Sequence, residues 1–433
     1  MWNIYTRTRR TYRTRGCARG EARWFRSVIP VPFFAWLFYT YATMVKLTIR
    51  KDRSGPVKGF HPWVFSKALA SIPEGLAPGE PVELYDEAGS FIASGYFNSY
   101  GQISVRLWGR EKDESVGTAF FVRRLERAGD IRRRYVENPD TNAFRLVNGE
   151  SDLLPGLIVD RYGEYLVVQF HTRGMEHWKN EVIESLVRTF RPGGIWERSD
   201  VSVRSIEMLG AVRGLLYGDV PDTIEVAENG LKFLVDVKEG QKTGFFLDQR
   251  DKRRAFMKYA QDRDVLNCFS YTGGFTVYAL AGGARLVVNV DSSRRALDVA
   301  RENVILNGFD PSRCEFTCDD AKRYLREPAR RFEAIILDPP AFIKDRRKKQ
   351  GGLAGYRAIN EMAMRSLSPE GILVTCSCSA HLSLNDFRFL LSEAGAKTGK
   401  PLSILEVHTH GIDHPQLVPF TEGEYLKCFI LKG

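Results

Sequence analysis

The chain has 433 residues, 43% of them hydrophobic and 12% aromatic, which excludes a disordered or fibrous protein and predicts two or three globular domains. Its seven cysteines are an odd number and several fall within predicted strands, so we expect reduced thiols in a cytoplasmic protein and not a disulfide framework. The formal net charge is +10, but residues 1–27 hold eight arginines and one acid, so overall charge is weak evidence for a nucleic-acid partner.

The first 43 residues join that arginine-rich run to an uncharged apolar run containing Pro30 and Pro32. The apolar run is too short and too interrupted to span a membrane, although a charged start before an apolar run can resemble a signal peptide. Met44 opens an alternating strand-like segment, and ordinary globular sequence follows it. We therefore expect residues 1–43 to be a leader that is disordered or not translated, with Met44 as the physiological start.

Between residues 44 and 115, short β-type segments alternate with turn residues, which predicts a small β-barrel. The segment at residues 58–65, Lys-Gly-Phe-His-Pro-Trp-Val-Phe, precedes that barrel and resembles the start of a PUA domain, a module that binds structured RNA. We expect Trp63 and Phe65 to fill the barrel core, with base stacking as the alternative.

Residues 116–225 form the next predicted region, with helices at 120–135 and 175–190 and strands at 165–171 and 194–198. This pattern is typical of an α+β insert. Because it holds no recognisable catalytic constellation, we expect it to be a connecting module.

The region from residue 226 to 433 is organised around a predicted βαβ unit: a strand near 265–269, a turn at Gly273-Gly274, a helix at 276–281 and a strand at 285–290 that ends at Asp291. Glycines there let backbone N–H groups approach a ligand, and a carboxylate 18 residues after Gly273 suits ribose hydroxyls. The three-glycine dinucleotide fingerprint is absent, which favours a ligand without phosphate, such as S-adenosylmethionine. A purely structural glycine turn is the alternative.

Strands and helices continue to alternate as far as residue 431, which predicts a doubly wound parallel sheet with its ligand at the carboxyl ends of the strands. Three acids, Asp291, Asp320 and Asp338, fall at successive strand ends. These positions resemble class I methyltransferases, and the resemblance implies that Asp291 binds the ribose, that Asp320 lies near the adenine amino group and that Asp338 lies between cofactor and substrate base. Polar and aromatic residues before the βαβ unit, among them Lys242 and Phe246, are further candidates. The expected cofactor contacts are Gln241, Phe269, Ser270, Tyr271, Thr272, Gly273, Asp291, Asp320 and Asp338.

The segment Val374-Thr375-Cys376-Ser377-Cys378-Ser379 ends the fifth strand of this sheet and resembles the nucleophile segment of RNA pyrimidine carbon-5 methyltransferases. A thiolate that adds to carbon 6 activates carbon 5 for methylation. We assign the nucleophile to Cys378, with Cys376 second; two buried structural cysteines are the alternative. The expected catalytic residues are Cys378, Asp338 and, as the base that removes the carbon-5 proton, Glu424.

Further motifs at residues 152–156, 241–248, 413–415 and 424–427 extend the resemblance from Met44 to Gly433. The chain resembles PUA-containing class I 23S ribosomal RNA (cytosine-C5)-methyltransferases, with a Rossmann-like catalytic domain at residues 226–433. The resemblance implies S-adenosylmethionine as cofactor, no metal, no membrane and a possible homodimer. It also implies a single-stranded or flipped-out target base in 23S RNA. Expected RNA contacts are Lys344, Arg346, Arg347 and Lys348, with a solvated loop as the alternative.

Three rival functions remain; a dehydrogenase is the third, and the missing third glycine counts against it. The same fold could methylate uracil carbon 5 or a guanine exocyclic amine, and a chain that keeps the fold without catalysis could act as an RNA-binding assembly factor.

Overall fold

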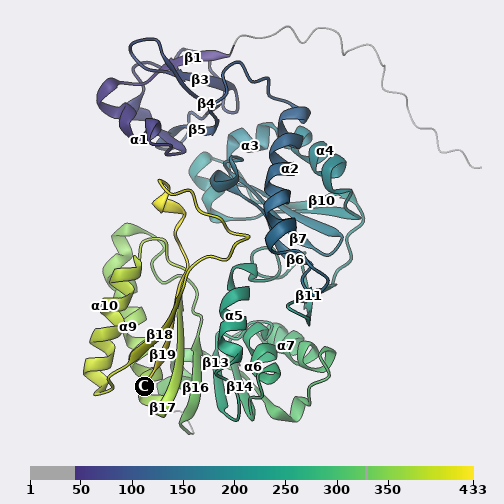
Figure 1. Ribbon diagram of the computed structural model, residues 1–433, viewed down its shortest axis with the longest axis vertical. Helices are drawn as coiled ribbons and strands as arrows, with labels where there is room; N and C mark the ends of the chain where they lie inside the picture. The colour runs from purple at the N-terminus through teal and green to yellow at the C-terminus, as the bar shows by residue number, and fades with distance from the viewer. Residues whose placement is uncertain (1–43, 327–329) are drawn as a thin grey trace, which may run out of the picture. The chain divides into compact units, whose positions relative to one another are not determined.

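The computed structural model describes residues 44–326 and 330–433, and Met44–Gly433 form one compact unit. Within the described part, three β-sheets and a two-stranded hairpin follow one another along the chain (Figure 1). No helix in that part is long and apolar enough to cross a membrane. The expected leader, residues 1–43, lies outside the described residues.

The first sheet has the strand order β1-β3-β4-β5-β2 and is antiparallel except for the β1–β3 pair. Its core contains Leu47, Val64 and Val82. The expectation that Phe65 fills this core was wrong: the side chain is 42% exposed, because Trp63 and Phe65 alternate with the buried Val64 along β2 and point to the other face. The elements are β1 (Val45–Thr48), α1 (Ser54–Lys58), β2 (Trp63–Phe65), β3 (Pro81–Tyr85), β4 (Phe91–Phe97) and β5 (Ile103–Gly109).

The middle sheet has the strand order β10-β9-β8-β7-β6. Phe121 and Leu125 of α2 and Leu186 of α4 pack against it, and Tyr96 and Trp108 of the first sheet belong to the same core cluster. The first two sheets therefore share a hydrophobic core. The elements are α2 (Thr118–Tyr135), β6 (Ala143–Asn148), β7 (Leu157–Tyr162), β8 (Tyr165–Phe170), α3 (Arg173–His177), α4 (Lys179–Phe190), β9 (Gly194–Ser199) and β10 (Val212–Gly218).

A β-hairpin, β11 (Ile224–Glu228) and β12 (Leu231–Val235), joins the middle sheet to the last one. Val226 and Phe233 pack with Tyr278 of the last domain and with Tyr162 and Val167 of the middle sheet. The hairpin thus anchors the two regions to each other.

The last sheet has seven strands in the order β15-β14-β13-β16-β17-β19-β18. The five strands from β15 to β17 are parallel, as predicted, but β19 runs antiparallel to both neighbours, so the expected all-parallel sheet needs that correction. The strands are β13 (Asp264–Cys268), β14 (Leu286–Asp291), β15 (Cys314–Cys318), β16 (Phe332–Leu337), β17 (Leu367–Ser377), β18 (Ser403–His408) and β19 (Lys427–Lys432).

Helices cover both faces of this sheet (Figure 1). Alternate strand residues point to opposite faces, so Leu266 and Ile335 pack against one helix layer and Val265 and Ile336 against the other. One layer consists of α8 (Ala321–Arg326), α9 (Lys349–Ser366) and α10 (Leu384–Thr398); the other consists of α5 (Arg250–Met257), α6 (Gly274–Ala281) and α7 (Arg294–Leu306).

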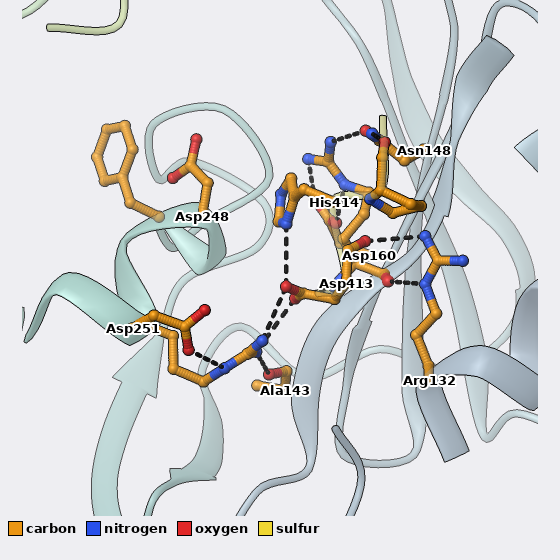
Figure 2. A network of polar contacts seen from close by, with 12 residues as sticks. Arg132, Ala143, Asn148, Asp160, Asp248, Asp251, Asp413 and His414 are labelled. Atoms are coloured by element: carbon orange, nitrogen blue, oxygen red, sulfur yellow. Dashed lines mark hydrogen bonds and ion pairs between the residues drawn. The ribbon is translucent and has the colours of Figure 1, made fainter. Parts of the chain in front are cut away.

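The segment between β18 and β19 reaches the middle sheet through a buried polar network (Figure 2). Arg250 of α5 donates two hydrogen bonds to the Asp413 carboxylate, at 3.1 and 2.8 Å. Arg132 of α2 donates to the backbone oxygen of Asp413 at 2.8 Å and pairs with Asp152 at 2.6 and 2.8 Å. Because Arg132 and Asp413 are fully buried, this network fixes the segment in one position.

Candidate active site

A cavity of about 1110 Å³ opens where the parallel strands β13, β14 and β16 end. The turn after β13, the ends of β14 and β16 and the residue after β17 line one side of it. Arg145, His171 and Arg198 of the middle sheet line another. This is the crevice in which open α/β sheets bind their ligands.

Residues 269–272, in the turn after β13, form one wall of the cavity. Backbone N–H groups of Phe269 and Ser270 donate to the oxygen of Val290, at 2.9 and 3.2 Å, which holds the turn against β14. The buried hydroxyls of Ser270 and Thr272 have no hydrogen-bond partner in the described structure. Because both residues line the cavity beside the first turn of α6, they fit a ligand that brings polar groups to this wall.

Asp291, the last residue of β14, lies in the same wall. Its carboxylate accepts the backbone N–H groups of Tyr271 and Ser293, each at 2.9 Å. The Tyr271 hydroxyl accepts from the N–H of Gln241 at 2.8 Å and donates to the oxygen of Gly244 at 3.0 Å, which connects this wall to the segment before α5. A carboxylate fixed in this way keeps lone pairs for two ribose hydroxyls. The wall therefore fits an adenosyl ligand.

Two further acids that line the cavity have opposite pKa shifts. The Asp338 carboxylate, directly after β16, accepts a 2.8 Å hydrogen bond from Gln249 Nε2. Burial and the charge of Asp248 raise the pKa of Asp338 to about 6. Burial alone would raise the pKa of Asp248 as well, but Lys242 and a 2.8 Å hydrogen bond from the Tyr425 hydroxyl hold it well below its usual range. Asp248 is thus a fixed anion, and Asp338 can gain or lose a proton near neutral pH.

The two cysteines of the expected nucleophile segment have different surroundings. Cys378 directly follows β17, lines the cavity and has its Sγ 3.8 Å from the oxygen of Pro339. Burial raises the pKa of its thiol to about 11, and nearby Lys242 opposes that rise. Cys376 is fully buried in the sheet beside Cys428 of β19 and does not line the cavity. Only Cys378 can therefore reach a ligand there.

The middle sheet supplies part of the cavity, so the expectation that this region only connects its neighbours was wrong. His171 lies in this wall, and burial among arginines lowers its pKa to about 3, which leaves the ring neutral at physiological pH. Glu150, also in the wall, accepts hydrogen bonds of 2.9 Å from Trp63 and from Arg106 of the first sheet. Trp63 packs edge-on against Phe420 at 4.8 Å, which brings all three sheets to one site.

Three residues expected as cofactor contacts or catalytic residues, Gly273, Asp320 and Glu424, do not line the cavity. Asp320 is exposed and accepts the backbone N–H of Arg323 at 2.9 Å in the first turn of α8. Glu424 is exposed as well, although its neighbour Tyr425 lines the cavity. The cofactor roles of Gly273 and Asp320 and the proton-removing role of Glu424 stay predictions.

The expected RNA-binding loop follows Asp338 by a few residues. Lys344, Arg347 and Lys348 are exposed, and Arg347 is hydrogen-bonded to Asp345 at 2.8 Å. The backbone of Arg346 lies in the short 3₁₀ helix Arg346–Lys348. Their contact with RNA stays a prediction.

The cavity residues to which sequence reasoning assigned no role include Asp248, Gln249 and Tyr425. Asp248 and Tyr425 lie within two motifs that carry the family resemblance, at residues 241–248 and 424–427, and Gln249 directly follows the first motif. The available signal was the polar run Asp-Gln-Arg just before a helix, but its partners are distant in sequence. Among the described residues, no group of His, Cys, Asp or Glu side chains is arranged to hold a metal ion.

Comparison with known families agrees with this geometry. Residues 209–427 match the S-adenosylmethionine-dependent methyltransferase family, and residues 47–110 match the PUA-like domain. The chain is 43% identical over 390 residues to ribosomal RNA large subunit methyltransferase I of Tolumonas auensis and 41% identical over 389 residues to that of Erwinia tasmaniensis. Each alignment covers 89% of this chain and 98% of the relative.

Solved structures show the same fold. A protein from Streptococcus mutans, provisionally described as a SAM-dependent methyltransferase, superposes with a TM-score of 0.78 at 23% identity, over 90% of this chain and all of that one. A second methyltransferase structure with the same score and identity is complexed with SAH.

Proposed function

The chain belongs to the ribosomal RNA large subunit methyltransferase I family of S-adenosylmethionine-dependent enzymes, and on that basis we propose that it forms 5-methylcytosine in 23S ribosomal RNA. One observation carries the choice of carbon 5: a cysteine sulfur, Cys378 Sγ, stands in the same cavity as the residues that fit the adenosyl ligand. Methylation of an amine nitrogen needs no such thiol, because nitrogen is itself nucleophilic.

Carbon 5 of cytosine is a poor nucleophile, and the thiol removes that difficulty. Cys378 passes its proton to the ionised Asp338 carboxylate, and its thiolate forms a bond to carbon 6, which pushes electron density onto carbon 5. Bound S-adenosylmethionine would supply the electrophilic methyl group: carbon 5 bonds to it as the bond from that methyl group to sulfur breaks. A base then removes the proton from carbon 5, the electron pair of that C–H bond restores the C5–C6 double bond, and the C6–Sγ bond breaks. The released thiolate then regains a proton, which restores the thiol of the free enzyme.

We propose that Asp338 contacts the edge of the target cytosine that carries N3. A pKa of about 6 leaves a carboxyl group that can place a proton near cytosine N3 as carbon 6 is attacked, which draws electrons away from carbon 6. The fixed anion Asp248 keeps that pKa high, and Tyr425 and Lys242 keep Asp248 ionised. Glu424 remains the proposed base for the carbon-5 proton.

RNA must present an unpaired base to this cavity. A nucleotide inside a helix cannot bring carbon 6 to Cys378, so we propose that the target is single-stranded or flipped out. The exposed cations at Lys344, Arg347 and Lys348 follow the Asp338 segment directly and would bind the phosphates beside it. The PUA-like domain, with its residue Trp63 at the junction of the sheets, would hold more distant RNA.

Mass mapping of 23S ribosomal RNA tests the proposal. A strain that lacks the gene is complemented with the wild-type chain, with Cys378→Ala or with Cys376→Ala. Cys376 lies two residues away, within β17 and outside the cavity, so its variant is the matched control. We expect one 5-methylcytosine that depends on the gene and is lost only with Cys378→Ala.

If the nucleotide that depends on the gene carried its methyl group on uracil carbon 5 or on a guanine amine, the proposed product would be wrong and one of the alternative functions would be right. Normal methylation by Cys378→Ala would remove the covalent mechanism. If no 23S nucleotide depended on the gene, the substrate itself would be wrong.

A further inference from the structure

The amide nitrogen of Gln249 makes a hydrogen bond, whereas the amide oxygen has no partner in the described structure. This residue lies in a 3₁₀ turn, Leu247–Gln249, just before α5, is 3% exposed and lines the cavity. Its Nε2 donates to Asp338 Oδ1 at 2.8 Å. Its Oε1 is shielded from solvent and accepts no hydrogen bond in the described structure. A buried amide oxygen without a donor is costly, and a ligand seated against this wall would supply one.

The Asp338 carboxylate fixes which way this amide points. An ionised carboxylate can only accept hydrogen bonds, so it holds the NH₂ end of Gln249 and leaves the oxygen end for the ligand. With a pKa of about 6, Asp338 is mainly ionised in the free enzyme at neutral pH and above. The wall therefore offers an acceptor, not a donor, at this point.

That pattern distinguishes the two pyrimidines. Cytosine carries an amino group on carbon 4, which donates hydrogen bonds, whereas uracil carries an oxygen there, which only accepts. Cys378 Sγ lies 3.8 Å from the oxygen of Pro339, the residue after Asp338, so the nucleophile and the Gln249–Asp338 pair belong to one stretch of the wall. Cys378, Asp338 and Gln249 all line the one cavity that a target ring would enter.

We propose that Gln249 determines specificity for cytosine over uracil by accepting a hydrogen bond from the 4-amino group of the target base. This inference rests on the proposed carbon-5 methylation and adds the residue that recognises the base. Uracil would place its carbon-4 oxygen against Gln249 Oε1 and leave two acceptors facing each other without a proton, which a buried site penalises strongly.

A chemical double-mutant cycle tests the contact. One transcript carries cytosine at the position found by mass mapping, and a second carries 2-pyrimidinone there, which lacks only the 4-amino group. The kcat/KM for methylation of each transcript is measured with the wild-type enzyme and with Gln249→Met, which keeps the length of the side chain and removes its polar atoms. Comparing the two proteins cancels the different reactivity of the two rings.

We expect the wild-type enzyme to prefer cytosine over 2-pyrimidinone more strongly than Gln249→Met does, by on the order of 10-fold to 100-fold. Gln249→Glu, which keeps an acceptor, should retain most of the wild-type preference even if its rate falls. Binding of S-adenosylmethionine, measured by calorimetry, should be the same in wild type and both variants.

Three results would overturn the inference. Equal losses on both transcripts would assign Gln249 a structural role, and a loss of S-adenosylmethionine affinity would assign it to the cofactor. If the wild-type enzyme methylated no cytosine, the proposed function and this inference would fail together. An unchanged preference in Gln249→Met, with cytosine still methylated, would refute this inference alone.

Discussion

The Cys378 thiol should be almost entirely protonated in the free enzyme. Its pKa of about 11 means that roughly one molecule in a thousand holds the thiolate at pH 8. Because only the thiolate reacts with an alkylating agent, the alkylation rate of Cys378 should rise about tenfold for each pH unit between pH 7 and 10. Burial causes this shift, and the charges of Asp338 and Asp248 add to it.

The assay is alkylation by iodoacetamide at a series of pH values, followed by mass spectrometry of the Cys378 peptide. Cys318 is the internal control, because its thiol is exposed in the same molecule. We expect the rate at Cys378 to keep rising as far as pH 10. A rate at Cys378 that is already independent of pH near pH 8 would show a thiolate in the free enzyme and would refute this reasoning.

Three further predictions concern the thiol, the cofactor wall and the buried polar network. Lys242→Met should move the alkylation profile of Cys378 to higher pH, because the lysine charge favours the thiolate; an unmoved profile would contradict this. Asp291→Ala should weaken S-adenosylmethionine binding by about 10-fold to 100-fold in calorimetry, since hydrogen bonds to a carboxylate are lost. Asp413→Ala should lower the free energy of unfolding by about 3–5 kcal/mol, because Arg250 stays buried without its carboxylate. The folded-state pKa of Asp413 lies below its usual 3.8, so its stabilisation is present above that pH and lost on acidification. Urea unfolding of wild type and variant at pH 7 and pH 3 should therefore show a smaller difference at pH 3.

Much of the last domain could be predicted because its signal is local. Strands buried on both faces are short apolar runs, and the glycine turn at Gly273 and the acid at Asp291 mark the ends of two of them. The antiparallel direction of β19 could not be predicted from such runs. It depends on the path of the preceding segment, which Asp413 ties to Arg132 and Arg250, residues more than 150 positions earlier.

The candidate site shows the same limit. A catalytic role for Cys378 could be predicted, because a thiol is a suitable nucleophile and the residue follows the end of a strand, β17. The partner of Asp338 did not appear in any pattern, because Gln249 precedes it by 89 residues and meets it only in the folded sheet. The contribution of the middle sheet was missed for the same reason: His171 and Glu150 face a cavity that another domain completes.

Covalent trapping tests the central claim most directly. A transcript with 5-fluorocytosine at the target position has fluorine in place of the hydrogen on carbon 5. After methylation no proton can be removed there, so the covalent bond between Cys378 and carbon 6 does not break. Incubation with S-adenosylmethionine should give a stable complex of protein and RNA whose linked peptide contains Cys378. The complex should form with Cys376→Ala and be absent with Cys378→Ala. If the wild-type enzyme methylated the ordinary transcript but formed no such complex, Cys378 would not be the nucleophile.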